Sequence, residues 1–206
     1  MKAPTRLRYD LSYAGRPAGE EELIFEPTRE GYRMRLYAEV ALPLPKTRQE
    51  WTSVMDERGL PLRYTERVEG RGTRVFDLEF LRDEGVVVGK DLVLPYVTDY
   101  HDPLSLILAL SRFEGEVLTL PMVGGRVHAK RLPDQELEFP WGPVKTRVFR
   151  LRPGVSVIHF DAEGRPVRFA QRVGQYVFEA RLREAFEFEP QKEKEKKRPR
   201  RRRRKR

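Results

Sequence analysis

A histidine between two aspartates is the first group in this sequence that could do chemistry. The stretch is "DYHD", with Asp99, His101 and Asp102. Two carboxylates beside an imidazole could hold a metal ion or supply a general base, although a working base also needs a partner group within hydrogen-bonding reach. The alternative is structural: Asp102 precedes Pro103 and an apolar run, as a helix N-cap does, and Asp99 would complement the positive end of that helix. We favour the structural interpretation.

The other reactive side chains are few and scattered. His101, His128 and His159 are the only histidines, and they lie too far apart for a ligand-spacing motif, so only a zinc site assembled across strands would join them. Ser105 and Ser111 fall within the expected helix, where Ser105 would support the cap. The chain has no cysteine, which excludes thiol catalysis and Cys-ligated zinc. We therefore predict no catalytic residue, no metal, no cofactor and no enzyme activity.

The C-terminal stretch "QKEKEKKRPRRRRRKR", residues 191–206, carries the net positive charge. It holds 12 Lys or Arg and 2 Glu, while the whole chain has 41 basic and 32 acidic residues, so residues 1–190 keep 29 basic and 30 acidic residues. We expect one domain over residues 1–188 and a disordered basic tail over 189–206, because such a composition cannot bury a core. Free cations of this kind bind polyanions through counterion release, without sequence specificity. The predicted polyanion-binding residues are Lys196, Lys197, Arg198, Arg200, Arg201, Arg202, Arg203, Arg204, Lys205 and Arg206.

The partner of this tail stays open at the level of sequence. Nucleic acid or a ribonucleoprotein fits the charge, an anionic membrane surface is an alternative, and a purely solubilising extension is the third interpretation. No aromatic residue interrupts the tail, so it would follow phosphates rather than stack on bases.

The body that carries these groups alternates apolar and polar residues with the period of a strand. In "YRMRLYAEV", residues 32–40, every second residue from Tyr32 to Val40 is apolar. Similar runs recur, separated by turn signals such as "DERGLP" and "AEGRP". Short connections predict an antiparallel up-and-down meander of about eleven to thirteen strands. Because only one face is apolar, the fold class is mainly β, with the sheet curled into a barrel or half-barrel.

One segment breaks the alternation and predicts a helix over about 103–113. Asp102 suits the N-cap, Pro103 the first helical position, and Gly115 a left-handed end to the helix. The residues between them are apolar on nearly all sides, so we expect this helix to be buried against the concave side of the sheet.

These segments resemble a bacterial family, domain of unknown function 3108. The similar elements are "YDLSYAGRPAGEEEL", "YHDPLSLILALSRFEG", "GGRVHAKRL" and "VIHFDAEGRPVRF", and together they cover roughly residues 7–183. The resemblance implies an antiparallel half-barrel wrapped on a helix, similar to the lipoprotein carriers LolA and LolB, which hold acyl chains. It therefore implies a protein that binds an apolar ligand.

Large apolar side chains are expected on the inner face, where they would fill the core or leave a pocket for an apolar ligand. The candidate pocket residues are Trp51, Tyr64, Phe76, Phe80, Leu104, Leu108, Phe169 and Phe178. We expect a non-enzymatic protein that holds a lipid-like ligand or a protein partner, with an RNA- or ribosome-associated factor acting through the tail as the alternative. The opening residues lack an apolar signal region and no apolar run is long enough to span a membrane, so we expect a cytoplasmic protein.

Overall fold

The computed structural model describes residues 3–41, 45–153, 156–173 and 175–188. Their fourteen strands form one antiparallel sheet in the order β8-β7-β6-β5-β4-β3-β2-β1-β14-β13-β12-β11-β10-β9. The strands are β1 (Thr5–Tyr13), β2 (Arg16–Thr28), β3 (Gly31–Val40), β4 (Thr47–Asp56), β5 (Pro61–Glu69), β6 (Thr73–Leu81), β7 (Val86–Gly89), β8 (Leu92–Pro95), β9 (Val117–Met122), β10 (Gly125–Phe139), β11 (Gly142–Arg152), β12 (Ser156–Phe160), β13 (Pro166–Val173) and β14 (Tyr176–Glu187). The meander is confirmed, while the expected count of eleven to thirteen strands was too low.

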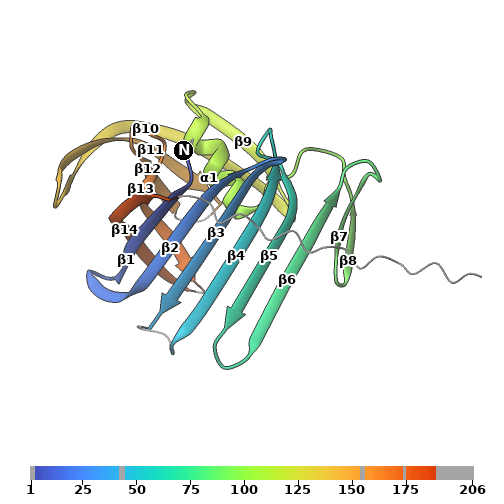
Figure 1. Ribbon diagram of the computed structural model, residues 1–206, viewed down its shortest axis with the longest axis horizontal. Helices are drawn as coiled ribbons and strands as arrows, with labels where there is room; N and C mark the ends of the chain where they lie inside the picture. The colour runs from blue at the N-terminus through green and yellow to red at the C-terminus, as the bar shows by residue number, and fades with distance from the viewer. Residues whose placement is uncertain (1–2, 42–44, 154–155, 174, 189–206) are drawn as a thin grey trace, which may run out of the picture.

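The sheet is curled but not closed. Its middle is the pairing of the first strand with the last, with Leu7 opposite Ala185 and Leu11 opposite Ala180. Its two ends are β8 and β9, which do not pair with each other. In Figure 1, strands β1–β6 form a front wall, β9–β13 lie behind it, and the helix lies between the two walls. The prediction of a half-barrel around one helix is therefore confirmed.

The helix α1 (Pro103–Arg112) begins where the sequence predicted. Oδ1 of Asp102 accepts hydrogen bonds from the backbone N–H groups of Leu104 and Ser105, both at 2.8 Å. The Ser105 hydroxyl in turn accepts a hydrogen bond from the Asp102 N–H at 2.9 Å, which completes a capping box. Seven of the ten helical residues are buried, and the helix packs against β3 and β4. The helix thus fills the concave side of the sheet, as expected.

The end of the helix differs from the prediction. Gly115 does not adopt the left-handed conformation, and the cap residue is Phe113 in an extended conformation with φ −82° and ψ 127°. Arg147, from β11, donates to the carbonyl oxygens of Ser111 and Phe113, each at 2.8 Å. A long-range guanidinium therefore satisfies carbonyls that a glycine motif would otherwise satisfy locally. Gly115 is needed for packing instead, because a Cβ there would lie 2.5 Å from the Phe113 ring.

Two apolar clusters occupy the inner face. The larger cluster surrounds α1 and contains residues from β1–β4 and β9–β14, among them Phe25, Phe149 and Phe178. The smaller cluster lies under β5–β8 and is formed by Tyr64, Leu78, Phe80 and Val87. Trp51 packs against both. No helix of the described residues is both long and apolar enough to cross a membrane.

Candidate functional site

The "DYHD" segment is built into the helix start. Besides the capping contacts, Oδ2 of Asp102 accepts a hydrogen bond from the Ser53 hydroxyl of β4 at 2.5 Å. Complete burial raises the pKa of the Asp102 carboxyl to about 6, although these hydrogen bonds oppose the rise. His101 is buried as well, and its Nδ1 lies 3.2 Å from the Ser105 hydroxyl. Asp102 therefore ties the start of the helix to β4, while His101 contacts the serine of the capping box.

Asp99 has partners of its own, and the expectation that it complements the positive end of the helix stays a prediction. Its carboxylate accepts hydrogen bonds from Arg58 at 2.8 Å and from the Tyr96 hydroxyl at 3.0 Å. Two donors from outside the helix thus engage the Asp99 carboxylate.

The three histidines have separate partners. Nδ1 of His128 lies 2.9 Å from the Thr119 hydroxyl on the neighbouring strand. Nε2 of His159 lies 3.1 Å from the side-chain oxygen of Gln135. Within the described residues, no group of three His, Cys, Asp or Glu is placed to hold a metal ion.

The predicted pocket residues are divided between the two apolar clusters. Leu104, Leu108, Phe169 and Phe178 lie in the larger cluster and are buried. Tyr64 and Phe80 are buried in the smaller one.

Only two of the eight candidates retain accessible surface on the inner side. Trp51 is half-buried, and Phe76 is 46% exposed with its ring 6.5 Å from the Tyr64 ring, centre to centre. Most of the predicted lining is thus packed core, with Phe76 as the exposed exception.

The residues proposed to bind polyanions, Lys196–Arg206, lie outside the described residues. That these residues bind polyanions stays a prediction from the sequence.

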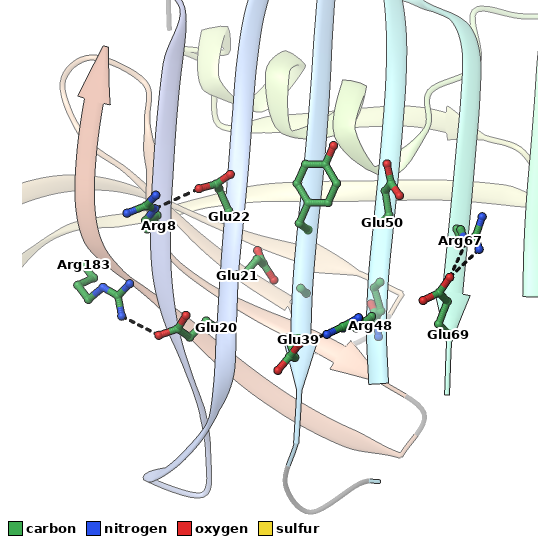
Figure 2. A pocket seen from close by; sticks show the side chains of 13 residues that line it. Arg8, Glu20, Glu21, Glu22, Glu39, Arg48, Glu50, Arg67, Glu69 and Arg183 are labelled. Atoms are coloured by element: carbon green, nitrogen blue, oxygen red, sulfur yellow. Dashed lines mark hydrogen bonds and ion pairs between the residues drawn. The ribbon is translucent and has the colours of Figure 1, made fainter. Parts of the chain in front are cut away.

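The outer face of β1–β5 carries a charged groove of about 530 Å³. Its wall is a lattice of arginines and glutamates, drawn in Figure 2. The pairs are Arg8–Glu22 (3.1 Å), Arg48–Glu39 (3.1 Å), Arg67–Glu69 (2.6 Å) and Arg183–Glu20 (2.9 Å). The lining holds six glutamates and four arginines, and each of these arginines engages a carboxylate, so the groove carries no excess of positive charge for an anionic ligand.

One of the residues that line the groove is a buried carboxyl that the sequence reasoning missed, Glu21 (Figure 2). Glu21 of β2 points to the inner face with Leu23 and Phe25, and it is only 2% exposed. Neither of its carboxyl oxygens has a hydrogen-bond partner among the residues that the structure describes. Burial raises the pKa of Glu21 to about 8. At neutral pH this side chain is therefore mostly uncharged.

The second hollow is a cleft of about 470 Å³ whose walls are mainly apolar. The apolar residues are Trp141, Val144, Val167, Leu182, Ala185 and Phe186. The polar ones are Asp161, Arg165, Arg183 and Glu184. Trp141 is 53% exposed and Phe186 is 36% exposed, so two aromatic side chains stand at the cleft with much of their surface uncovered.

The long β10–β11 hairpin shapes this cleft. Pairing between β11 and β12 begins only at Arg147, so residues 133–146 project beyond β12. The tip of the hairpin is fixed to β14, because the Arg181 guanidinium lies 5.0 Å from the centre of the Phe139 ring and donates to the carbonyl oxygen of Glu138. Trp141 stacks on Phe139 with ring centres 4.9 Å apart. The exposed indole is thus held in place across from β13 and β14.

An ion pair between a buried aspartate and a partly exposed arginine borders the cleft. Asp161, which is 2% exposed, accepts hydrogen bonds from the backbone N–H of Arg165 at 2.8 Å and from its Nε at 2.6 Å. The turn "DAEGRP" between β12 and β13 brings the two side chains together. The arrangement can orient a guanidinium beside apolar walls. Sequence reasoning singled out this turn only as a turn signal and a family element, and it passed over Trp141, whose turn "FPWGP" is the one available signal.

Fold and hollows together define a class of protein, an open antiparallel β half-barrel around one helix with an apolar cleft at its rim. Within that class, the chain belongs to the family described as "Protein of unknown function (DUF3108)", whose model matches residues 8–171. The family resemblance predicted from sequence is confirmed. The likeness to LolA and LolB stays a prediction.

A solved structure supports the fold independently. The chain is similar to the crystal structure of a beta-barrel-like protein of domain of unknown function DUF1849 from Brucella abortus, with a TM-score of 0.61 and 15% sequence identity. The similarity covers 91% of this chain and 98% of that one. No curated protein sequence matches the chain.

Proposed function

We propose that this protein is a non-enzymatic binding protein that holds an apolar, lipid-like ligand in the cleft at Trp141. The observation that carries the proposal is the pair of exposed aromatic side chains, Trp141 and Phe186, beside the buried floor residues Val167 and Leu182. Apolar surface of this kind is costly to leave in water, and it favours a ligand or partner that covers it. The volume of about 470 Å³ falls in the range of small-molecule sites, roughly 300–1,000 Å³.

The contacts of the reactive side chains support a binding role over catalysis. Asp102 and His101 serve the helix start, while His128 and His159 pair with neighbouring side chains. A general base must reach the proton that it abstracts, whereas these side chains already form hydrogen bonds with other groups of the protein.

Two tryptophans allow a direct test. In a Trp51→Phe variant, Trp141 is the sole tryptophan and reports on the cleft. Titration with dodecanol should shift the Trp141 emission to the blue and saturate, because the bound chain removes water from an indole that is 53% exposed. The matched Trp141→Phe variant retains Trp51, and its emission should respond much less.

Native mass spectrometry of the purified protein, followed by organic extraction, tests for a ligand carried from the cell. An added mass that disappears on extraction is expected. The proposal is wrong if dodecanol causes no saturable change at Trp141 and no small-molecule adduct is found. A stable complex with another protein, without such an adduct, would also contradict it and assign the cleft to a protein partner.

A further inference from the structure

The proposed ligand site has a polar end whose chemistry selects among apolar ligands. That end is Arg165, which lines the cleft and is anchored by the buried carboxylate of Asp161 through Nε and the backbone N–H. Two contacts to one carboxylate fix both the chain and the guanidinium plane. The guanidinium is thus oriented before any ligand arrives, which reduces the entropy lost on binding.

One edge of this guanidinium is available. Nη2 of Arg165 donates to Glu163 at 3.1 Å, and Nη1 has no partner among the described residues. The Arg165 side chain is 35% exposed, whereas the Glu163 side chain is 64% exposed. An ion pair so open to water contributes little, so a ligand anion can take the place of Glu163 at small cost.

The other charges at the cleft are already paired. Arg183 contacts Asp10 at 3.0 Å and Glu20 at 2.9 Å, and Glu184 lies 3.4 Å from Arg8. Both carboxylates that line the cleft, Asp161 and Glu184, are therefore engaged by arginines. A cationic head group would find no unpaired carboxylate there, while an anionic one would find the N–H groups of Arg165.

We propose that the ligand is an amphiphile with an anionic head group, a carboxylate or a phosphate, bound by Arg165 while its apolar part lies against Trp141, Val144 and Leu182. This inference rests on the proposed function and adds the charge of the ligand. The planar guanidinium matches such oxyanions because it can donate two parallel hydrogen bonds.

Head groups on one chain length test the inference. Dodecanoate, dodecyl phosphate, dodecanol and dodecylammonium are titrated into the Trp51→Phe protein below their micelle concentrations, with Trp141 emission as the readout. We expect the better anion to bind at least about tenfold more tightly than dodecanol, the usual size of a hydrogen bond to a charged group. Dodecanoate and dodecyl phosphate distinguish a carboxylate ligand from a phosphate-headed one.

Variants of the same turn identify the residue responsible. Arg165→Gln should abolish the preference for the anion over dodecanol, whereas Glu163→Gln should keep or increase the preference. Arg165→Lys keeps the positive charge but cannot donate two parallel hydrogen bonds, so this variant should retain only part of the preference for the anion. Arg183→Gln, at the same cleft, is the matched control and should not alter the preference. Thermal denaturation shows that each variant is folded.

The outcomes separate the two proposals. Equal affinity for dodecanoate, dodecyl phosphate and dodecanol overturns the anionic head group and leaves an apolar ligand in place. Tightest binding of dodecylammonium overturns it as well, because the sign of the charge is then wrong. Failure of all four probes overturns the proposed function itself.

Discussion

The buried carboxyl of Glu21 should make the stability of this protein fall steeply with pH. The pKa of Glu21 is raised from 4.5 to about 8 because burial penalises the charged form and no donor within the described part of the chain compensates. Between these two values the unfolded chain has lost the proton and the folded chain keeps it. The folded state therefore binds more protons, and its stability decreases as pH rises through this window.

The size of the effect follows from the width of that window. At 1.36 kcal/mol per pH unit, the interval from 4.5 to about 8 corresponds to about 5 kcal/mol, of which about 4 kcal/mol lies between pH 5 and pH 8. That loss is a large share of the stability of an ordinary domain, roughly 5–15 kcal/mol. Glu21→Gln keeps the shape and the polar atoms but cannot ionise. Relative to the wild type, this variant should gain about 4 kcal/mol between pH 5 and pH 8.

Urea denaturation at pH 5, 6, 7 and 8 measures the difference, since the comparison of two proteins cancels other groups such as Asp102. Glu50→Gln is the matched control, because Glu50 lies exposed on the outer face of β4 and makes no ion pair with another described residue. This variant should follow the wild type at every pH. Parallel curves for Glu21→Gln and the wild type would refute the reasoning, and they would mean that Glu21 reaches water or a donor.

Three further outcomes are expected. Leu108→Ala should lower the free energy of unfolding by roughly 2–5 kcal/mol, the range for truncating a large buried side chain. Asp102→Ala should lower it by about 2 kcal/mol, because the variant loses both the helix cap and the hydrogen bond from Ser53. The denaturation midpoints of the two variants and the wild type measure these differences. Arg181→Ala should release the β10–β11 tip and weaken dodecanol binding at Trp141, with unchanged melting as the check on folding. Deleting residues 191–206 should leave the melting transition nearly unchanged and abolish salt-sensitive binding to non-specific RNA in a filter assay; comparable RNA binding by the truncated body would place the basic surface on the barrel.

Local patterns predicted the elements of this fold well. The alternation over residues 32–40 appears as β3, and Asp102 with Pro103 marks the start of α1. Both features depend on a few neighbouring residues, so a sequence read in short windows contains them. Glu21 was also within reach, because it shares the parity of Leu23 and Phe25 in "EEELIF" and must therefore face inward with them.

Contacts between distant segments were the part that the sequence could not supply. The helix end depends on Arg147, about 35 residues further along, whose guanidinium makes a left-handed Gly115 unnecessary. The cleft depends on the length of the β10–β11 hairpin. Trp141 lines the cleft because Arg181 of β14 contacts the tip of this hairpin and holds it in place. The aromatic residues chosen as pocket lining were mostly core for the same reason, since the volume left by α1 is set by the curvature of the whole sheet.

The pairing of β1 with β14 has a consequence for synthesis on the ribosome. Strand β1 can pair with β14 only after nearly the whole described chain has been translated, because Thr5 lies opposite Glu187 in the folded protein. Contacts between residues so far apart in the sequence form slowly, because the chain loses the entropy of closing a long loop before the contacts can stabilise it. Until then β1 is an unpaired edge, open to strands of other nascent chains. The β1–β8 and β9–β14 meanders can each assemble from local hairpins, so joining them through β1 and β14 is the step at which a chaperone would matter most.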